Sequence, residues 1–240
     1  MAEISRQDVI KMIGTRREGK VFLDGVDLSD LDLSQLNFQN VSLRNANLSK
    51  ANLSRTQFEE ADLDGAELKN ADLSNSYLKK CNMKFCRLPE IKIMGSTFTE
   101  CILESTMFTG SYLERCHFKK SQMDGVWLDS VYMDRASFMD TKLTHANLRA
   151  SYLGSVFFKN ADLSFSDLRW ASLIGTDFSD ANLYSVNLSD AYYFNSTQWP
   201  VNFDLTKTGA RMVVEVDGGE NYSEARAVRQ RLSANWNWNR

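Results

Sequence analysis

The sequence has little of what marks membrane, secreted and nucleic-acid-binding proteins. Its 240 residues include only two prolines, Pro89 and Pro200, and no apolar run approaches the roughly 18 residues of a membrane-spanning helix. The N-terminus shows no basic segment followed by an apolar stretch and a small-residue cleavage site, so a cytoplasmic location is expected. The net charge is −3 without a basic block, which argues against direct nucleic-acid binding, and no membrane partner is expected.

Groupings of catalytic or metal-binding residues are also missing. No CxxC-like pair, glycine-rich phosphate loop or nucleophile motif occurs, so neither a metal site nor a cofactor is expected. The only two histidines, His117 and His145, fall at outward positions of the pattern described below. The aspartates are numerous, but the same pattern accounts for them. We therefore expect a protein that is not an enzyme.

What the sequence does have is a five-residue repeat. Every fifth residue from Leu23 to Tyr193 is Leu, Phe, Met, Ile or Tyr, without insertion or deletion. The residue two positions earlier is usually small, and the one between them is usually polar. Five residues rotate a helix by about 140°, and an odd spacing alternates the faces of a strand, so neither element keeps these residues together. The consistent fold is a short extended step and a corner, wound around an axis with both apolar positions inside.

Phenylalanine adds a second period of twenty residues. It occupies every fourth central position, and Leu78 fills the single gap in the series. The phenylalanines of this series are Phe38, Phe58, Phe98, Phe118, Phe138, Phe158 and Phe178. Four pentads should therefore complete a turn, with the phenyl rings stacked as a structural ladder along one inner side. Parallel backbones lie about 4.8 Å apart, so almost nine turns would give a rod of roughly 40 Å.

The cysteines follow the same pattern. All four occupy the small inward position, at Cys81, Cys86, Cys101 and Cys116. They are expected to act as small buried hydrophobic residues. Cys81 and Cys101 lie one turn apart, but a disulfide between them would need an oxidising compartment.

The segments ANLSK, ADLDG and ADLSN resemble the pentapeptide-repeat family. The resemblance covers about residues 21–195, most of the chain. It implies an all-β solenoid, a right-handed quadrilateral β-helix, here of about nine coils. The TQWP segment, which ends at Pro200, resembles terminal segments of cyanobacterial family members.

Three segments are expected: an N-terminal capping helix in 1–20, the β-helix in 21–195, and a C-terminal cap and tail in 196–240. The helix is predicted over 5–18, with Ser5 as its N-cap and an apolar stripe at Val9, Ile10 and Ile13. The alternative for this helix is a free amphipathic element that binds a partner.

The C-terminal segment is predicted to contain a strand at 212–216, a turn at 217–219 and a helix at 223–232. Trp236 and Trp238 either dock on the open end of the solenoid or are disordered.

One departure from the repeat occurs at Pro89, with Ile91 where a small residue belongs. Proline removes a backbone donor, and Ile91 should widen the coil, so a bulge or bend is predicted near 88–95. Packing variation and a functional hinge are the two interpretations of this site.

Function must lie on the surface of such a rod. On one outer side the second half carries tyrosines, interrupted once by Ser172. Trp170 is expected near Ser172, where it could cover the gap, and Trp127 projects from the adjacent side. Exposed aromatic patches tend to mark interfaces, whereas stacked tyrosines can also merely stabilise neighbouring turns. The candidate partner-binding residues are Tyr112, Tyr132, Tyr152, Trp170, Tyr192 and Trp127.

The sequence therefore predicts a non-enzymatic interaction, scaffolding or regulatory module that binds a protein partner and is a monomer or weak homodimer. The resemblance supplies the alternative, because some family members resemble B-form DNA in shape and charge and bind DNA gyrase, which confers resistance to topoisomerase poisons. Three features depart from that pattern: a small net charge, acidic residues on all four sides, and some 45 residues after the repeat.

Overall fold

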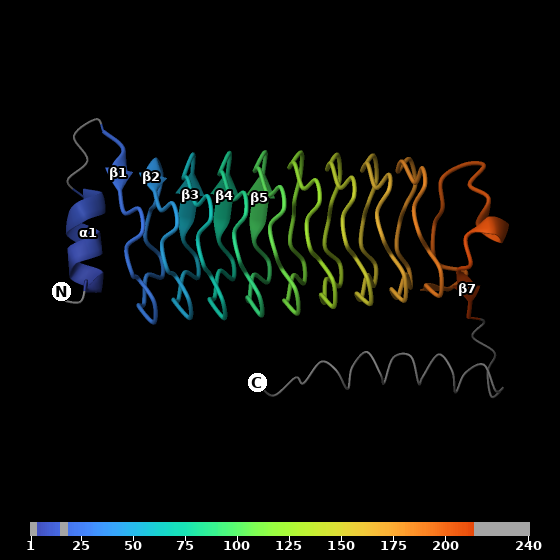
Figure 1. Ribbon diagram of the computed structural model, residues 1–240, viewed down its shortest axis with the longest axis horizontal. Coiled ribbons are helices and arrows are strands. Elements are labelled where there is room, and N and C mark those ends of the chain that lie inside the picture. The colour runs from blue at the N-terminus through green and yellow to red at the C-terminus, as the bar shows by residue number, and fades with distance from the viewer. Residues whose placement is uncertain (1–3, 15–18, 214–240) are drawn as a thin grey trace.

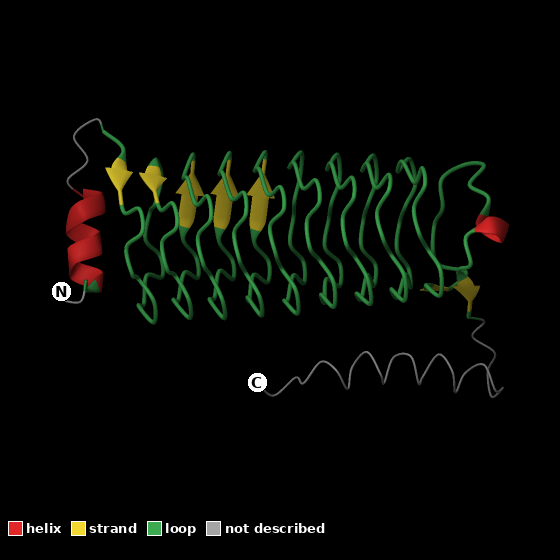
Figure 2. Cartoon of the chain, in the orientation of Figure 1, coloured by secondary structure: helices red, strands yellow, loops and turns green. Residues whose placement is uncertain are grey.

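The computed structural model describes residues 4–14 and 19–213, which form one elongated coil (Figure 1). The regular elements are α1 (Arg6–Gly14), β1 (Val21–Phe22), β2 (Val41–Ser42), β3 (Gln57–Glu59), β4 (Tyr77–Lys79), β5 (Thr97–Thr99), β6 (Tyr192–Tyr193), the 3₁₀ helix η1 (Leu205–Lys207) and β7 (Arg211–Met212). Figure 2 shows that loops and turns make up most of the rod, and single β-bridges join successive coils along it. Within the described ranges no helix has the length and apolarity needed to cross a membrane.

The coil repeats every twenty residues. Parallel pairing joins β1 to β2, and β3 to β4 to β5, with Phe58 opposite Leu78 and Leu78 opposite Phe98. Single parallel bridges keep the same interval along all four sides. The interval changes only at the C-terminal end, where Asp177 pairs with Gln198 and β6 pairs with β7. The chain is therefore a β-helical solenoid of four pentads per turn.

Backbone hydrogen bonds explain this geometry. The amide of Leu43 donates to the next coil at the Asp62 carbonyl (2.7 Å), and the amide of Asn47 donates to the preceding coil at Val26 (3.0 Å). The amide of Ala46 closes the corner on Leu43 (3.1 Å). The last corner residue has a positive φ, as at Asn45 with 53°, a conformation that Asn and Gly adopt at low cost.

The frequent Asp or Asn before each centre also has a local role. Its side chain accepts a hydrogen bond from the amide two residues later, as between Asn47 Oδ1 and Ser49 N (3.1 Å) and between Asp72 Oδ1 and Ser74 N (2.8 Å). This amide, at the first corner position, lies outside the backbone ladder. The Asx turn satisfies it.

The interior is one continuous apolar core. Stacked rings lie 4.8 Å apart between Phe98 and Phe118 and again between Phe118 and Phe138, with interplanar angles of 14° and 7°. The same stacking joins Phe38 to Phe58 (5.0 Å). It continues through the last two rings of the ladder, where the separations are 5.2 Å. Ring contacts thus run along one inner side, interrupted at Leu78.

The predicted bulge at Pro89 is wrong. Bridges continue on both sides of it without a change of register, and the turn closes normally through Ile91 N and the Leu88 carbonyl (3.4 Å). Pro89 occupies the corner position whose amide is outside the ladder, so it removes no ladder bond. Glu90 follows with a φ of 58°, which matches a type II turn, where proline is favoured at this place. Ile91 is fully buried within the core.

At the N-terminus, α1 is capped as predicted by Ser5. The amide of Asp8 donates to Ser5 Oγ (3.3 Å), and the amide of Ser5 donates to Asp8 Oδ2 (3.1 Å), which is a reciprocal capping arrangement. Val9 is fully buried in the core, and Ile13 packs against it. Of the helix predicted over 5–18, residues 15–18 lie outside the described residues.

At the C-terminus the ring ladder gains a tryptophan. The Trp199 ring stacks on Phe178 (5.2 Å) and on Phe203 (5.5 Å). Of the strand predicted at 212–216, Met212 belongs to β7 and Val213 lies just after it. Residues 214–216 lie outside the described residues. The predicted turn at 217–219, the helix at 223–232, and Trp236 and Trp238 lie outside the described residues.

Candidate functional site

The four cysteine side chains are packed inside the coil. All four cysteines are buried and unpaired, and Cys116 Sγ donates to the Ile93 carbonyl of the preceding coil (2.6 Å). Burial raises the pKa of the Cys116 thiol to about 12 and raises the pKa of Cys86 as well. Such thiols carry little nucleophilic thiolate at neutral pH. No metal-binding group of His, Cys, Asp and Glu occurs in the part of the chain that the structure describes.

The predicted tyrosines form one outward column, with neighbours joined by parallel bridges through Ser172. We call Tyr112, Tyr132, Tyr152 and Tyr192 the tyrosine column. Its members are only partly exposed. The rings of Tyr132 and Tyr152 stack 5.0 Å apart with an interplanar angle of 7°. Ser172, at the gap, is fully buried, and its hydroxyl lacks a hydrogen-bond partner within the described ranges.

Gly154 makes room for this column. A Cβ at Gly154 would lie 2.4 Å from Cε1 of Tyr152 and 2.7 Å from Oδ1 of Asp134, so the Tyr152 ring lies across the glycine. Desolvation there raises the pKa of the Asp134 carboxyl. Desolvation and the nearby Asp134 raise the pKa of Tyr132 to about 12. The middle of the column, Tyr132 and Tyr152, is thus held by ring stacking and by close packing at Gly154.

Trp127 and Trp170 are more exposed and lie along another side. Trp127 bridges to Asn147, and Asn147 bridges to Asp167, so these three share one outward column. Trp127 is 48% exposed. Trp170 stands at the corner that ends this side and is 44% exposed. The structure therefore groups the two tryptophans with Asp167, whereas the tyrosine column lies around the corner.

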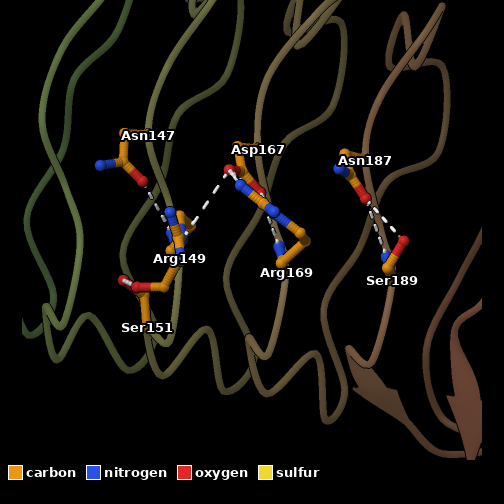
Figure 3. A network of polar contacts seen from close by, with 7 residues as sticks. All are labelled: Asn147, Arg149, Ser151, Asp167, Arg169, Asn187 and Ser189. Atoms are coloured by element: carbon orange, nitrogen blue, oxygen red, sulfur yellow. Dashed lines mark hydrogen bonds and ion pairs between the residues drawn. The ribbon is translucent and has the colours of Figure 1, made fainter.

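Two arginines support Trp170. The guanidinium carbon of Arg149 lies 4.7 Å from the Trp170 ring centroid, and that of Arg169 lies 5.4 Å away. Arg169 donates to Asp167 through Nε (2.9 Å to Oδ1) and Nη2 (2.6 Å to Oδ2), as Figure 3 shows. Burial alone would raise the pKa of Asp167, but the bonds and charge of Arg169, with the charge of Arg149, lower it overall. We call Trp127, Arg149, Asp167, Arg169 and Trp170 the tryptophan–arginine surface.

Sequence reasoning missed an aromatic group at the opposite corner of this same side. The ring of His145 stacks on Phe165 (5.2 Å, 11°), and Tyr184 meets Phe165 edge-on (5.4 Å, 83°). We call these three residues the aromatic corner. Phe165 is 51% exposed. The available signal was a bulky aromatic residue at the fifth position of a pentad, where Asn, Asp and Gly recur.

That fifth position carries a conformational cost for aromatic residues. Phe165 has a φ of 61° and Trp170 a φ of 59°, in the left-handed region that bulky residues rarely adopt. The same conformation recurs at nearly every corner of the coil, for example at Arg55, Lys80 and Phe85, so the repeat imposes it and it does not by itself mark these two positions. Neither ring is buried in the core, so packing of the core does not account for its presence. Both rings therefore leave apolar area exposed on the surface of the rod.

Many surface charges are paired between adjacent coils. Lys79 Nζ lies 2.9 Å from Glu59, Lys84 Nζ lies 2.7 Å from Glu104, and Lys142 Nζ lies 3.1 Å from Asp124. The acidic side chains therefore alternate with basic ones along the rod. The surface lacks a continuous acidic stripe over these coils.

Comparisons with known proteins agree with this architecture. One family model, described as a pentapeptide repeat region, matches residues 52–128. A second, described as pentapeptide repeats in eight copies, matches 23–58 and 161–192. No curated protein matches the chain.

Two solved structures are among those similar to this chain, and the first shares its fold. Full-length QnrB1, a plasmid-mediated fluoroquinolone resistance protein, is 15% identical with a TM-score of 0.62, over 88% of this chain and 96% of its own. HetL, a pentapeptide repeat protein involved in heterocyst differentiation regulation in the cyanobacterium Nostoc sp. strain PCC 7120, is 21% identical with a TM-score of 0.35, over 90% of this chain and 99% of its own. From the repeat, the fold and these matches, the chain belongs to the pentapeptide-repeat family and is a right-handed β-helical solenoid.

Proposed function

We propose that this chain is a non-enzymatic interaction module that binds a protein partner through the tryptophan–arginine surface. The observation that carries the proposal is Trp170, an exposed ring at a left-handed corner that is braced by Arg149 and Arg169. Tryptophan, tyrosine and arginine are enriched among the few residues that carry most of the binding energy of protein interfaces. Because this ring is already held in place, little side-chain freedom is lost when a partner binds.

The tyrosine column takes a secondary part in this proposal. Tyr132 and Tyr152 are packed against each other and at Gly154, and all four tyrosines are less exposed than Trp127 and Trp170. We propose that Tyr132 and Tyr152 border the interface around the corner and stabilise the neighbouring coils.

Affinity purification with the wild-type rod, followed by mass spectrometry, tests the proposal. A partner should be retained by wild type and lost with the double variant Trp127→Ser, Trp170→Ser. Tyr77→Ser is the matched control, because Tyr77 is an exposed aromatic residue on another side, in β4. Tyr132→Ser with Tyr152→Ser should weaken retention less than the tryptophan variant does. Undiminished capture by a folded tryptophan variant would contradict the proposal.

The DNA-mimicking, gyrase-binding function is the alternative, and the charge arrangement does not favour it. A mimic of the DNA backbone needs dense negative charge, whereas the acidic residues here pair with lysines and arginines of adjacent coils. The similarity to QnrB1 is a similarity of fold only, at 15% sequence identity. Inhibition of gyrase supercoiling at micromolar protein would restore this alternative.

We also propose that the rod has about nine coils, that α1 caps one end and that the segment after residue 195 caps the other. Burial of Val9 in the core and the stacking of Trp199 on Phe178 support this. Val9→Asp should then lower the melting temperature and expose apolar surface to a hydrophobic dye, whereas Gln7→Asp, at an exposed position of the same helix, should change neither.

A further inference from the structure

The two arginines of the tryptophan–arginine surface differ in how many guanidinium N–H donors are free to bind another group. Arg169 is occupied, because Asp167 takes up its Nε and Nη2 donors at 2.6–3.1 Å. Arg149 approaches Asp167 only to 3.9 Å at Nε, which is longer than a hydrogen bond. Within the described ranges its guanidinium makes no hydrogen bond, and the side chain is 41% exposed.

Asp167 and Trp170 together hold Arg149 in a defined place. The ring of Trp170 contacts its guanidinium at 4.7 Å, and the amide of Arg149 donates to Asn147 Oδ1 at 3.3 Å (Figure 3). The guanidinium is planar, and its remaining N–H groups match the two oxygens of a carboxylate. An exposed cation therefore lies directly beside an exposed indole.

We propose that this corner binds a protein segment that carries a carboxylate next to an aromatic or aliphatic side chain. The carboxylate pairs with Arg149, and the apolar group packs on Trp170 and extends toward Trp127. This inference rests on the proposed function and names the chemistry of its partner. Contacts of this kind combine a charge-assisted hydrogen bond with burial of apolar area.

The charges around the corner favour a single carboxylate over a polyanion. Arg149, Arg169 and Asp167 together carry one net positive charge, and the chain as a whole carries −3. Nucleic acids gain affinity by neutralising several phosphates at once, whereas only one guanidinium is available here. Asp167 thus orients Arg149 and also limits the attraction of phosphate polymers.

Panning of a phage-displayed library of random dodecapeptides tests this. Peptides are selected on the wild-type rod and counter-selected on the double variant Trp127→Ser, Trp170→Ser. We expect enrichment of sequences with Asp or Glu adjacent to Trp, Phe or Leu. Synthetic versions are then titrated by fluorescence anisotropy against wild type and variants.

Arg149→Gln should weaken these peptides about tenfold or more, because a charge-assisted bond is lost. Arg149→Lys should recover part of the loss. Arg87→Gln should leave affinity unchanged; it is the control, since Arg87 lies in the outward column of Trp127 and Asp167, several coils from Arg149, and pairs there with Glu67. Replacing the peptide's acid with its amide should reproduce the effect of Arg149→Gln.

The outcomes separate the two proposals. Selected peptides that need the tryptophans but lack an acid, or that bind Arg149→Gln as tightly as wild type, overturn the carboxylate inference and leave the proposed function standing. A duplex oligonucleotide that binds in an Arg149-dependent way also overturns it, in favour of phosphate. A selection that yields no peptide dependent on the tryptophans overturns both.

Discussion

The phenyl ladder can be tested by comparing two alanine substitutions at positions of equal burial. Phe118 and Phe58 are both fully buried on the same inner side. Phe118 stacks on Phe98 and Phe138, each at 4.8 Å, and meets Phe108 edge-on at 6.3 Å. Phe58 stacks only on Phe38, because its other ladder neighbour is Leu78.

The difference in free energy of unfolding follows from these contacts. Each Phe→Ala change should cost about 3–5 kcal/mol from lost burial and the resulting cavity. Phe118→Ala also loses one more stacked pair and one edge-on pair, each worth about 0.5–1.5 kcal/mol. It should therefore exceed Phe58→Ala by about 1–3 kcal/mol.

Urea unfolding followed by far-ultraviolet circular dichroism measures this difference. The comparison holds when both variants keep the denaturant slope of wild type, since the slope reports the surface exposed on unfolding. Phe118→Leu and Phe58→Leu place at each site the residue that occurs naturally at Leu78, and they leave smaller cavities than the alanine variants. Phe118→Leu should again lose more free energy of unfolding than Phe58→Leu. Equal losses at the two sites, or a larger loss at Phe58, would refute ring stacking as a source of stability in this core.

Three further predictions concern the corners and the surface. Lys119→Pro should be nearly neutral, because that corner amide donates to no ladder carbonyl, whereas Gln122→Pro deletes a ladder bond of 2.9 Å and should cost about 1–3 kcal/mol in urea titrations. Gly154→Ala should displace the ring of Tyr152, whose Cε1 would lie 2.4 Å from the new Cβ, and cost about 1–3 kcal/mol; the cost should be smaller in a Tyr152→Ser background, where the close contact with Asp134 Oδ1 remains. Asp167 has a pKa below its ordinary value of 3.8 in the folded protein, so its contribution to stability is present above that pH and is lost as the pH falls through the folded pKa. Between about pH 5 and about pH 2 the melting temperature of wild type should accordingly fall further than that of Asp167→Asn, and parallel declines would contradict this.

Much of the fold is readable from the sequence because one geometric rule recurs in every pentad. The spacing of the apolar centres requires a corner after each extended step, and the period of Phe98, Phe118 and Phe138 sets the number of steps in a turn. The capping pair of Ser5 and Asp8 is equally local, since it depends on residues three apart. Such features need no knowledge of distant contacts.

The prediction at Pro89 was wrong for a specific reason. It treated every backbone amide as part of the ladder, whereas the folded coil uses four amides per pentad for backbone bonds, three between coils and one at the corner, and leaves the first corner amide to side chains. Proline costs nothing extra at that place. The rule becomes visible only when donors and acceptors of neighbouring coils are traced in three dimensions.

The candidate site shows the same division between local and tertiary information. The sequence by itself determined which residues face outward and which share a column, because side-chain direction follows the pentad. Only the tertiary structure decided that Asp167 engages Arg169 more closely than Arg149, and that the Trp170 ring lies against both arginines. Those choices depend on side-chain conformations across coils twenty residues apart in sequence, where packing and charge, rather than spacing, select the contact.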